Sequence, residues 1–482
     1  MRDIGYEINI GLEVHLQLST KSKAFCPCAT RFGAEPNTQT CPVCMGLPGS
    51  LPVLNKAALA GAIKAALALN CDIGKKMKFD RKNYYYPDLP KNFQISQYDT
   101  PLSHGGFLDI MTTAGAKKIR IKRVHMEEDA GKLFHKKGYS LIDFNRAGTP
   151  LLEIVSEPDM SSPEEAHTYL TRLKALLKYL DVSDCNMEEG SLRCDANISL
   201  RKKGSARLGT KAELKNMNSF KGVKNALAYE AKRQSSILDD GGRIVQETLL
   251  WNADKAVTTS MRSKEEAHDY RYFPEPDLVP FLIEEKMVAD IKKTIPELPD
   301  ARRERFVREY GIPEYDASVL TQERKTADFF EKTVKAGGRP KEVSNWIMGD
   351  ITAILKEKKL EIDRTRLSPE NLARMVGMLN DGAISVKIAK AILPEMLDGG
   401  DAPEEIVAKK SLAQISDAGE LEGVIAKVLG ENKKTVEDYM AGKKNAVIFL
   451  VGQAMKATRG KANPGMVNEI LRKKLKEKGP GA

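Results

Sequence analysis

The feature of this sequence that most restricts its fold is a strict alternation of apolar and polar side chains over residues 8–18. Every second residue is aliphatic: Ile8, Ile10, Leu12, Val14, Leu16 and Leu18. Successive side chains of a β-strand point to opposite faces, so the pattern predicts a strand with one face in a core and one polar face. Residues 192–200 repeat it. Residues 117–128 are a third candidate strand, whose alternation slips near Lys122 and Arg123 and predicts a β-bulge.

Helical patterns first separate these strands and then replace them. Residues 55–70 are rich in Ala and Leu, and residues 162–179 open with the capping signature SSPEEA, so both are predicted helices. Beyond residue 300 the apolar spacing is helical throughout. We therefore predict an α+β domain over residues 1–293, an all-helical domain over 294–405 and a basic helical tail over 406–482. The length of 482 residues agrees with about three domains.

Composition excludes two classes of protein. Hydrophobic residues make up 41% of the chain, which is too many for a disordered protein. The most apolar run, residues 446–455, is far shorter than the ~20 residues that span a bilayer, so we expect no membrane segment. The N-terminus lacks the apolar block of a signal peptide. Seven cysteines, an odd number in a long chain, indicate a reducing compartment, and we expect a cytoplasmic location.

The positive charge is concentrated at the C-terminus. The chain has a net charge of +10, and residues 443–482 hold ten lysines and arginines against two glutamates, a net charge of +8. In the segment MVNEILRKKLKEK, helical spacing puts apolar residues on one side and Arg472, Lys473, Lys474 and Lys476 mostly on the other. Such a helix favours a polyanionic partner, and the alternative is a terminus that only improves solubility.

The polar faces of the three strands carry an unusual set of acidic residues and histidines. Glu13 and His15 share one strand face, and Asp195 and Asn197 share another. The third strand ends in His125, Glu127, Glu128 and Asp129. Clustered carboxylates repel one another unless cations neutralise them, and oxygen ligands suit Mg²⁺. We therefore predict a magnesium site there, although any single pair would be an ordinary solvated sheet face.

Some basic residues are candidates to bind phosphate, and several common nucleotide-binding and hydrolase motifs are absent from the sequence. Lys82, in the segment that begins Arg81–Lys82, and the lysines of TKAELK are candidates to hold phosphate oxygens, or are surface lysines. The sequence has no GxxxxGK[ST], GxGxxG or GxSxG, and no glycine-rich serine pair that would provide an amidase nucleophile. Cys194 falls on the apolar face of its strand, where an inert thiol is expected.

Four of the cysteines have a spacing that is typical of metal ligands. The spacing Cys26-x-Cys28-x12-Cys41-x2-Cys44 places two thiols on each of two tight turns, which can close a tetrahedral Zn²⁺ site. The CxC half is less typical than CxxC, and reduced structural cysteines are the alternative. A site with four protein ligands has no open position, so the zinc would be structural.

Long segments of the sequence resemble one family. They are IGLEVHLQL, FDRKNYYYPDLPKNFQISQ, RVHMEEDAGK, DFNRAGTPLLEIVSEPD, MEEGSLRCDANIS, TKAELKNMNS, HDYRYFPEPDLVP, SNWIMGD and FLVGQAMKATRGKANP. On these motifs the chain is similar, over nearly its whole length, to the B subunits of bacterial aspartyl/glutamyl-tRNA(Asn/Gln) amidotransferases, the GatB family. The cysteine cluster occurs in only some members of that family.

The resemblance implies a fold and a reaction. The fold would be a cradle-shaped catalytic domain related to glutamine synthetase, a helical domain, and a small helical tail of the YqeY type that holds tRNA. The enzyme would use ATP and Mg²⁺ to phosphorylate the side-chain carboxylate of Glu-tRNA(Gln) or Asp-tRNA(Asn), and ammonia would then convert it to the amide. Glutamine hydrolysed on an amidase A subunit would supply the ammonia, in a heterotrimer with a small C subunit.

The resemblance also assigns residues. Glu13, His15, Glu128 and Asp195 match the pocket that binds Mg²⁺ and ATP, with Glu127 beside them and Lys82 as the phosphate clamp. Glu13, His15 and Glu128 are the expected magnesium ligands, and Cys26, Cys28, Cys41 and Cys44 the expected zinc ligands.

Two rival functions remain open on sequence alone. A ligase that joins a small carboxylate to an amine would not need the basic tail. A non-catalytic zinc protein that binds RNA would present bases and aromatics on its sheet, where this chain has acids.

Overall fold

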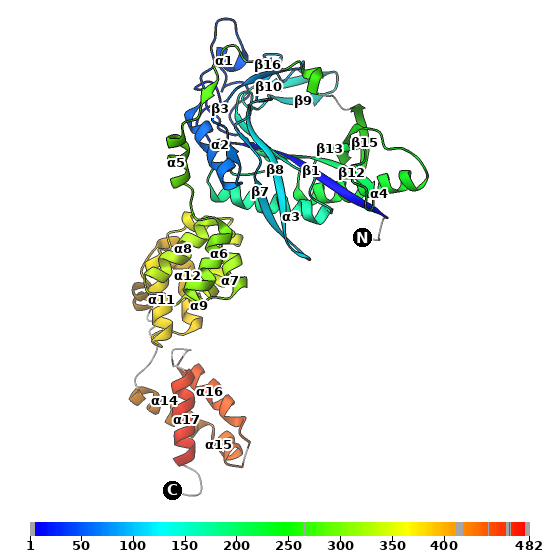
Figure 1. Cartoon of the computed structure of the whole chain (residues 1–482). Coiled ribbons are helices and arrows are strands. Elements are labelled where there is room, and N and C mark those ends of the chain that lie inside the picture. Colours follow the sequence, from blue (N-terminus) through cyan, green and yellow to red (C-terminus); the bar gives the residue numbers. More distant parts are fainter. Residues whose placement is uncertain are drawn as a thin grey trace. The chain divides into compact units, whose positions relative to one another are not determined.

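The computed structural model describes residues 5–263, 267–410, 418–441, 443–458, 462 and 464–477. The chain divides into two compact units, Met1–Leu298 and Pro299–Ala482. Strands occupy the first unit and helices the second (Figure 1), so the prediction of an α+β fold followed by a helical region is confirmed. The division into three domains at residues 293 and 405 stays a prediction, as does the relation to glutamine synthetase.

A ten-stranded sheet forms the centre of the first unit. Its strand order is β15-β14-β13-β12-β1-β11-β8-β6-β2, and β7 also pairs with β8. All pairs are antiparallel except β13 with β14. The strands are β1 (Tyr6–Gln17), β2 (Asp72–Ile73), β6 (Ser103–His104), β7 (Phe107–Thr112), β8 (Gly115–Glu128), β11 (Pro150–Ser156), β12 (Leu192–Lys202), β13 (Ala212–Lys215), β14 (Glu247–Asn252) and β15 (Val257–Ser263).

Smaller sheets and helices surround the large sheet. The remaining strands are β3 (Lys76–Met77) with β17 (Phe281–Leu282), β9 (Lys132–Lys136) with β10 (Tyr139–Asp143), and β4 (Asp80–Asn83) between β5 (Phe93–Ser96) and β16 (Phe273–Pro274). The helices of this unit are α1 (Pro42–Met45), α2 (Lys56–Ala68), α3 (Pro163–Tyr179), α4 (Phe220–Asp239), α5 (Glu285–Lys293) and the 3-10 turn Ala267–Tyr270.

The predicted alternation decides which face of the sheet is buried. The even-numbered residues of β1 from Ile8 to Leu16 are at most 8% exposed and belong to one core with side chains of α2, α3 and α4. Figure 1 shows these helices along one side of the sheet, while the other side curves inward without them. The odd-numbered residues of β1, β11 and β12 therefore lie on the concave, helix-free face.

The structure also contains the helix caps and the β-bulge that the sequence predicts. Asn55 caps α2 by accepting hydrogen bonds from the N–H groups of Ala57 and Ala58, and Ser162 caps α3 by accepting one from Glu165. Between β8 and β11 the register shifts, because Val155 is opposite Arg123 whereas Ser156 is opposite Ile121. The extra residue is Lys122, so the predicted bulge is confirmed.

The second unit contains two separate hydrophobic cores. The first lies among α6 (Pro299–Tyr310), α7 (Glu314–Leu320), α8 (Arg324–Lys335), α9 (Pro340–Trp346), the π-helical turn Ile347–Ile351, α10 (Thr352–Lys358), the 3-10 turn Ile362–Arg364, α11 (Pro369–Asn380), α12 (Val386–Gly399) and α13 (Pro403–Lys409). The second, here called the tail core, lies among α14 (Ala418–Glu431), α15 (Lys433–Met440), α16 (Ala446–Ala457) and α17 (Pro464–Glu477). No helix among the described residues is long and apolar enough to cross a membrane.

Helix α17 is amphipathic as its sequence predicts. Val467, Leu471 and Leu475 are fully buried in the tail core, and Met466 and Ile470 pack beside them. Three of its four predicted outward cations, Arg472, Lys473 and Lys476, are exposed. The fourth, Lys474, is half-buried and lies 3.4 Å from Glu422 of α14.

The tail core gives a stability prediction. Leu471→Ala should destabilise it by about 2–5 kcal/mol, because the substitution removes a fully buried side chain and leaves a cavity. Hydrogen exchange of the full chain should then show loss of protection in α14, α16 and α17, with β1 unchanged. The control Ile470→Ala, at a half-buried position of the same helix, should have a smaller effect. Equal losses in the two variants would contradict this view of the core.

Candidate active site

Antiparallel register lines up polar side chains from four strands on the concave face. His15 of β1 is directly opposite Arg193 of β12 and Glu153 of β11, and Glu153 is directly opposite His125 of β8. Directly opposed residues have Cβ atoms about 5 Å apart and share one face of the sheet. Strands far apart in the sequence thus build one row of four charged or titratable groups.

Three members of this region can hold a cation together. The Nε2 atom of His15 lies 3.7 Å from a carboxylate oxygen of Glu127 and 3.6 Å from one of Glu153. One ligand atom from each residue lies within 4.8 Å of the others. His125 supports the group from β8, with its Nε2 atom 3.3 Å from Glu153 and 3.8 Å from Glu127. We call His15, Glu127 and Glu153 the metal cluster.

Electrostatics keep this cluster charged. Burial alone would lower the pKa of His15, but the hydrogen bond to Glu153 and the charges of Glu153, Glu127 and Asp195 outweigh it and raise the pKa to about 9. Burial alone would raise the pKa of Glu127 and Glu153, yet both are lowered because His125 and His15 stabilise the anions. The two carboxylates therefore stay ionised and require a positive charge beside them. Protonated His15 supplies this charge, and a metal ion that displaces the proton from the imidazole could supply it instead.

Two further carboxylates adjoin the cluster. Glu13 and Asp195 are directly opposite each other on β1 and β12, two residues along from His15 and Arg193. Asp195 pairs with Lys215 of β13, and Glu13 accepts a hydrogen bond of 3.0 Å from the amide of Asn197. Of the predicted residues, the structure thus brings Glu13, His15, Glu127 and Asp195 to one face.

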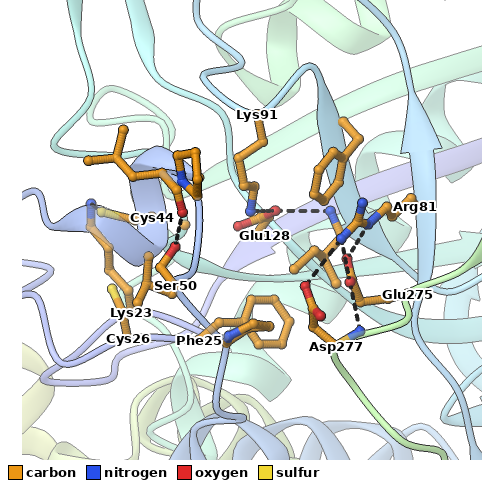
Figure 2. Close-up of a pocket in the computed structure, with 18 of the residues that line it drawn as sticks. Lys23, Phe25, Cys26, Cys44, Ser50, Arg81, Lys91, Glu128, Glu275 and Asp277 are labelled. Carbon is orange, nitrogen blue, oxygen red and sulfur yellow. Dashed lines mark hydrogen bonds and ion pairs between the residues drawn. The ribbon is translucent and has the colours of Figure 1, made fainter.

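Glu128 does not join them. Its carboxylate pairs with Lys91 and accepts a hydrogen bond of 2.9 Å from the N–H of Ile95. As Figure 2 shows, it lines a separate cavity of about 240 Å³ together with Lys23, Arg81 and Cys44. Adjacent residues of a strand point to opposite faces, so Glu127 and Glu128 cannot both face His15.

Glu153 is a site residue that was not predicted from the sequence. A signal for it was present, because Leu152 and Ile154 are core residues and the residue between them must point to the polar face. The segment LLEIVS is so apolar, however, that it does not alternate clearly. Only the pairing of β11 with both β1 and β8 brings Glu153 to His15.

Lys82 lies beside aromatic rings. Its Nζ atom is 4.8 Å from the ring centre of Tyr270 and 5.9 Å from that of Tyr84. Tyr84 is close enough to Glu127 for that charge to add to burial in raising the pKa of the phenol. Lys82 thus contacts aromatic rings, and no ion pair joins it to the metal cluster in the described part of the chain.

A cavity of about 260 Å³ adjoins Glu13 on the same face. Its lining includes Glu13, Asn197, Lys122, Lys211 and Gly209. A Cβ atom at Gly209 would meet the carbonyl oxygen of Leu200 at 1.9 Å, so only glycine lets this loop pass so close to β12. The cavity thus places two lysines next to the carboxylates of Glu13 and Glu157, an arrangement that suits a phosphate group with its metal ion.

The four cysteines of the zinc pattern come together in the loop region around α1. Their sulfur atoms all lie within 4.8 Å of one another, and tetrahedral Zn–S bonds of about 2.3 Å would bring them to about 3.8 Å. Cys44 is held by the backbone N–H of Cys41 at 3.2 Å and by the buried ammonium of Lys23 at 3.5 Å. A thiol hydrogen bond from Cys26, the Cys41 backbone and the Lys23 charge lower the pKa of Cys44. This donor set fits a structural zinc ion.

Zinc should therefore stabilise this loop region. We expect about one zinc per chain by elemental analysis, and Cys41→Ser should lower both the zinc content and the thermal stability, because binding energy of a structural metal contributes to folding. The matched control Cys71→Ser changes a buried cysteine outside the cluster and should keep the zinc. A fully stable, metal-free wild-type protein would show that the cysteines are only reduced thiols.

Comparison with known proteins identifies the family of this chain. A family model described as GatB/GatE catalytic domain matches residues 8–289, and one described as GatB domain matches residues 328–475. Similar proteins, named as the B subunit of aspartyl/glutamyl-tRNA(Asn/Gln) amidotransferase, include those of Caldanaerobacter subterraneus subsp. tengcongensis, 57% identical over 471 residues, and Carboxydothermus hydrogenoformans, 56% identical over 475 residues. Each alignment covers 98% of this chain and 99% of the relative.

The relative from Brevibacillus brevis, with the same name, is 54% identical over 472 residues. Both the catalytic sheet and the helical region are thus matched, and the resemblance seen in the motifs is confirmed. The chain belongs to the family of aspartyl/glutamyl-tRNA(Asn/Gln) amidotransferase B subunits.

Proposed function

We propose that this chain is the subunit that phosphorylates and amidates the side-chain carboxylate of Glu-tRNA(Gln), Asp-tRNA(Asn) or both. The observation that carries the proposal is the metal cluster on the concave face, with Glu13 and Asp195 beside it. A carboxylate substrate and ATP are both anions, so a site that joins them needs cations at the point of contact. Mg²⁺ bound to His15, Glu127 and Glu153 would neutralise charge that develops on the phosphoryl oxygens.

The reaction has two steps, phosphorylation of the carboxylate and its amidation. First, an oxygen of the substrate carboxylate attacks the γ-phosphorus of ATP, and ADP leaves. Ammonia then attacks the carbonyl carbon of the acyl phosphate, phosphate leaves, and the nitrogen loses a proton to form the amide. The role of this chain is mainly to position the two anions and to stabilise their charge, which is the main contribution of proteins to phosphoryl transfer.

We place ATP in the cavity beside Glu13. Lys122 and Lys211 would bind phosphate oxygens there, while Glu13 and Asp195 face the metal cluster from the same side. Lys82, beside Tyr84 and Tyr270, is the further candidate for a phosphate or carboxylate contact. Glu127 and Glu153 replace Glu128 in our proposed set of magnesium ligands.

The proposal requires an external source of ammonia. The sequence has no amidase motif, and the relatives are named as the B subunit of an amidotransferase, which implies a complex with other subunits. We propose an amidase A subunit and a small C subunit as partners, with the zinc loop as a structural element and the cytoplasm as the location.

The magnesium assignment can be tested directly. With ammonium chloride, ATP and mischarged tRNA supplied to the reconstituted complex, Glu153→Gln should raise the Mg²⁺ concentration for half-maximal amidation by about 10-fold or more, because it removes a ligand charge. Glu128→Gln is the matched control on the opposite face and should leave the Mg²⁺ requirement unchanged. Circular dichroism should confirm folding of both. A larger Mg²⁺ effect in Glu128→Gln would overturn the ligand set, and absence of amidation in the wild type would overturn the function.

The basic tail is proposed to bind the tRNA away from its reactive end. The support for this role is charge: Arg472, Lys473 and Lys476 are exposed on one side of α17, and the opposite side is anchored in the tail core. A rigid helix that presents several cations suits a phosphate backbone.

Replacing these three cations by glutamine should weaken tRNA binding without unfolding the tail. We expect the slope of log K against log salt concentration to fall by about two to three, because fewer counterions are released on binding. The control replaces three exposed lysines that lie outside the tail core, on or next to α10 and α12, by glutamine: Lys356, Lys359 and Lys387. Equal changes in both triple variants would argue against a specific role of α17.

A further inference from the structure

A cavity of about 290 Å³ lies at the end of β1, and the proposed reaction does not yet use it. Its floor comes from the concave face of the sheet, through Gln17 and Thr149. Its walls come from the loop between Cys28 and Cys41, which contributes Arg31 and Phe32, and from β9, which contributes Lys132 and Phe134.

The floor of this cavity is tied to the metal cluster. Gln17 follows His15 by two residues on the same strand face, so the two Cα atoms are about 7 Å apart. The amide of Gln17 donates a hydrogen bond of 2.7 Å to Asp129, and Asp129 pairs with Arg193 at 2.8 Å. Arg193 is the residue opposite His15. A ligand in the cavity would therefore be held at a fixed distance from the cluster.

The walls offer aromatic surface and positive charge. Phe32 is 65% exposed and Phe134 is 41% exposed, so both rings that line the cavity are open to a ligand. Lys132 lies 4.9 Å from the ring centre of Phe134. Neither Arg31 nor Lys132 is paired with a carboxylate in the described part of the chain. Exposed aromatic rings next to free cations are the combination that binds an unpaired nucleotide, since the base stacks and the phosphate is neutralised.

We propose that this cavity holds the terminal adenosine of the aminoacyl-tRNA, the nucleoside that bears the amino acid. The inference rests on the proposed function. A glutamyl ester extends roughly 6 Å from the ribose oxygen to its side-chain carboxylate, counted over standard bond lengths. That reach matches the spacing between Gln17 and His15, so with the ribose oxygen at Gln17 and the base against Phe32 and Phe134 the carboxylate would reach the metal cluster.

ATP fits this cavity less well. Arg146 also lines it, but its guanidinium already donates to the carbonyl oxygens of Ala130 and Gly131 at 2.9 and 2.6 Å. The acidic residues Asp143 and Glu189 line the cavity as well. Two cations suit a single phosphodiester. The triphosphate is better placed in the cavity beside Glu13, where the carboxylates that would hold its metal ion adjoin Lys122 and Lys211.

The test is a double-mutant cycle, in which the two phenylalanines are removed from the protein and the terminal adenosine is removed from the tRNA. In filter-binding assays with the reconstituted complex, wild type should bind intact tRNA about 5- to 150-fold more tightly than tRNA that lacks its terminal adenosine, the range for stacking of one base. The double variant Phe32→Ala/Phe134→Ala should bind both tRNAs with the same affinity. Because both rings are exposed, folding should be unaffected. Tyr139→Ala, an exposed residue of the neighbouring strand β10 outside the cavity, should behave as wild type.

Each other outcome overturns the assignment. If the double variant still distinguishes the two tRNAs as wild type does, or if wild type does not distinguish them, the terminal adenosine is not bound here. If the double variant instead loses affinity for ATP, the occupant is ATP. The amidation assay with ammonium is run on the same wild-type complex, so failure of the cavity assignment with normal amidation leaves the proposed function intact, and failure of amidation counts against the function alone.

Discussion

The antiparallel register of β12, β1, β11 and β8 is the constraint on which the site depends. Because His15 is opposite both Arg193 and Glu153, and Glu153 is opposite His125, residues from four distant segments meet on one face. A shift of one residue in any of these pairings would turn the polar residues of the shifted strand toward α2, α3 and α4 and its aliphatic residues to the opposite face. The hydrophobic effect that buries Ile10, Leu12 and Val14 therefore also fixes the geometry of the charges.

Each ionised group on the concave face of the sheet needs a neighbouring group of opposite charge. His15 carries a proton between two carboxylates, Lys215 neutralises Asp195, and Arg193 neutralises Asp129. These pairs are substantially buried, so each charge is favourable only while its partner is in place. Binding of a metal and of anionic substrates would change this set of pairs, which makes the face suited to phosphoryl transfer and costly to keep for structure alone.

The zinc loop and the concave face are continuous through the inferred nucleoside cavity. The same loop that carries the four cysteines contributes Phe32 and Arg31 to the cavity wall, and Lys23 links the cysteine cluster to the chain near Phe144. A structural metal that orders this loop would then affect tRNA binding without touching the reacting atoms. Loops that carry recognition residues often need such an anchor, because they lack a core of their own.

Much of this protein is determined by local sequence. The alternation over residues 8–18 specifies both the strand and its buried face, the caps Asn55 and Ser162 specify where two helices begin, and the slip at Lys122 specifies the bulge. These features follow from interactions among residues near one another in the chain, and the four cysteines are close enough in sequence for their spacing to indicate a common site. The tertiary structure alone decided that Glu153 rather than Glu128 meets His15 and Glu127, and that Phe32 and Phe134 share a cavity with Gln17. Strand partners are chosen by non-local packing, and a residue's neighbours across a sheet are fixed only when the strands have paired.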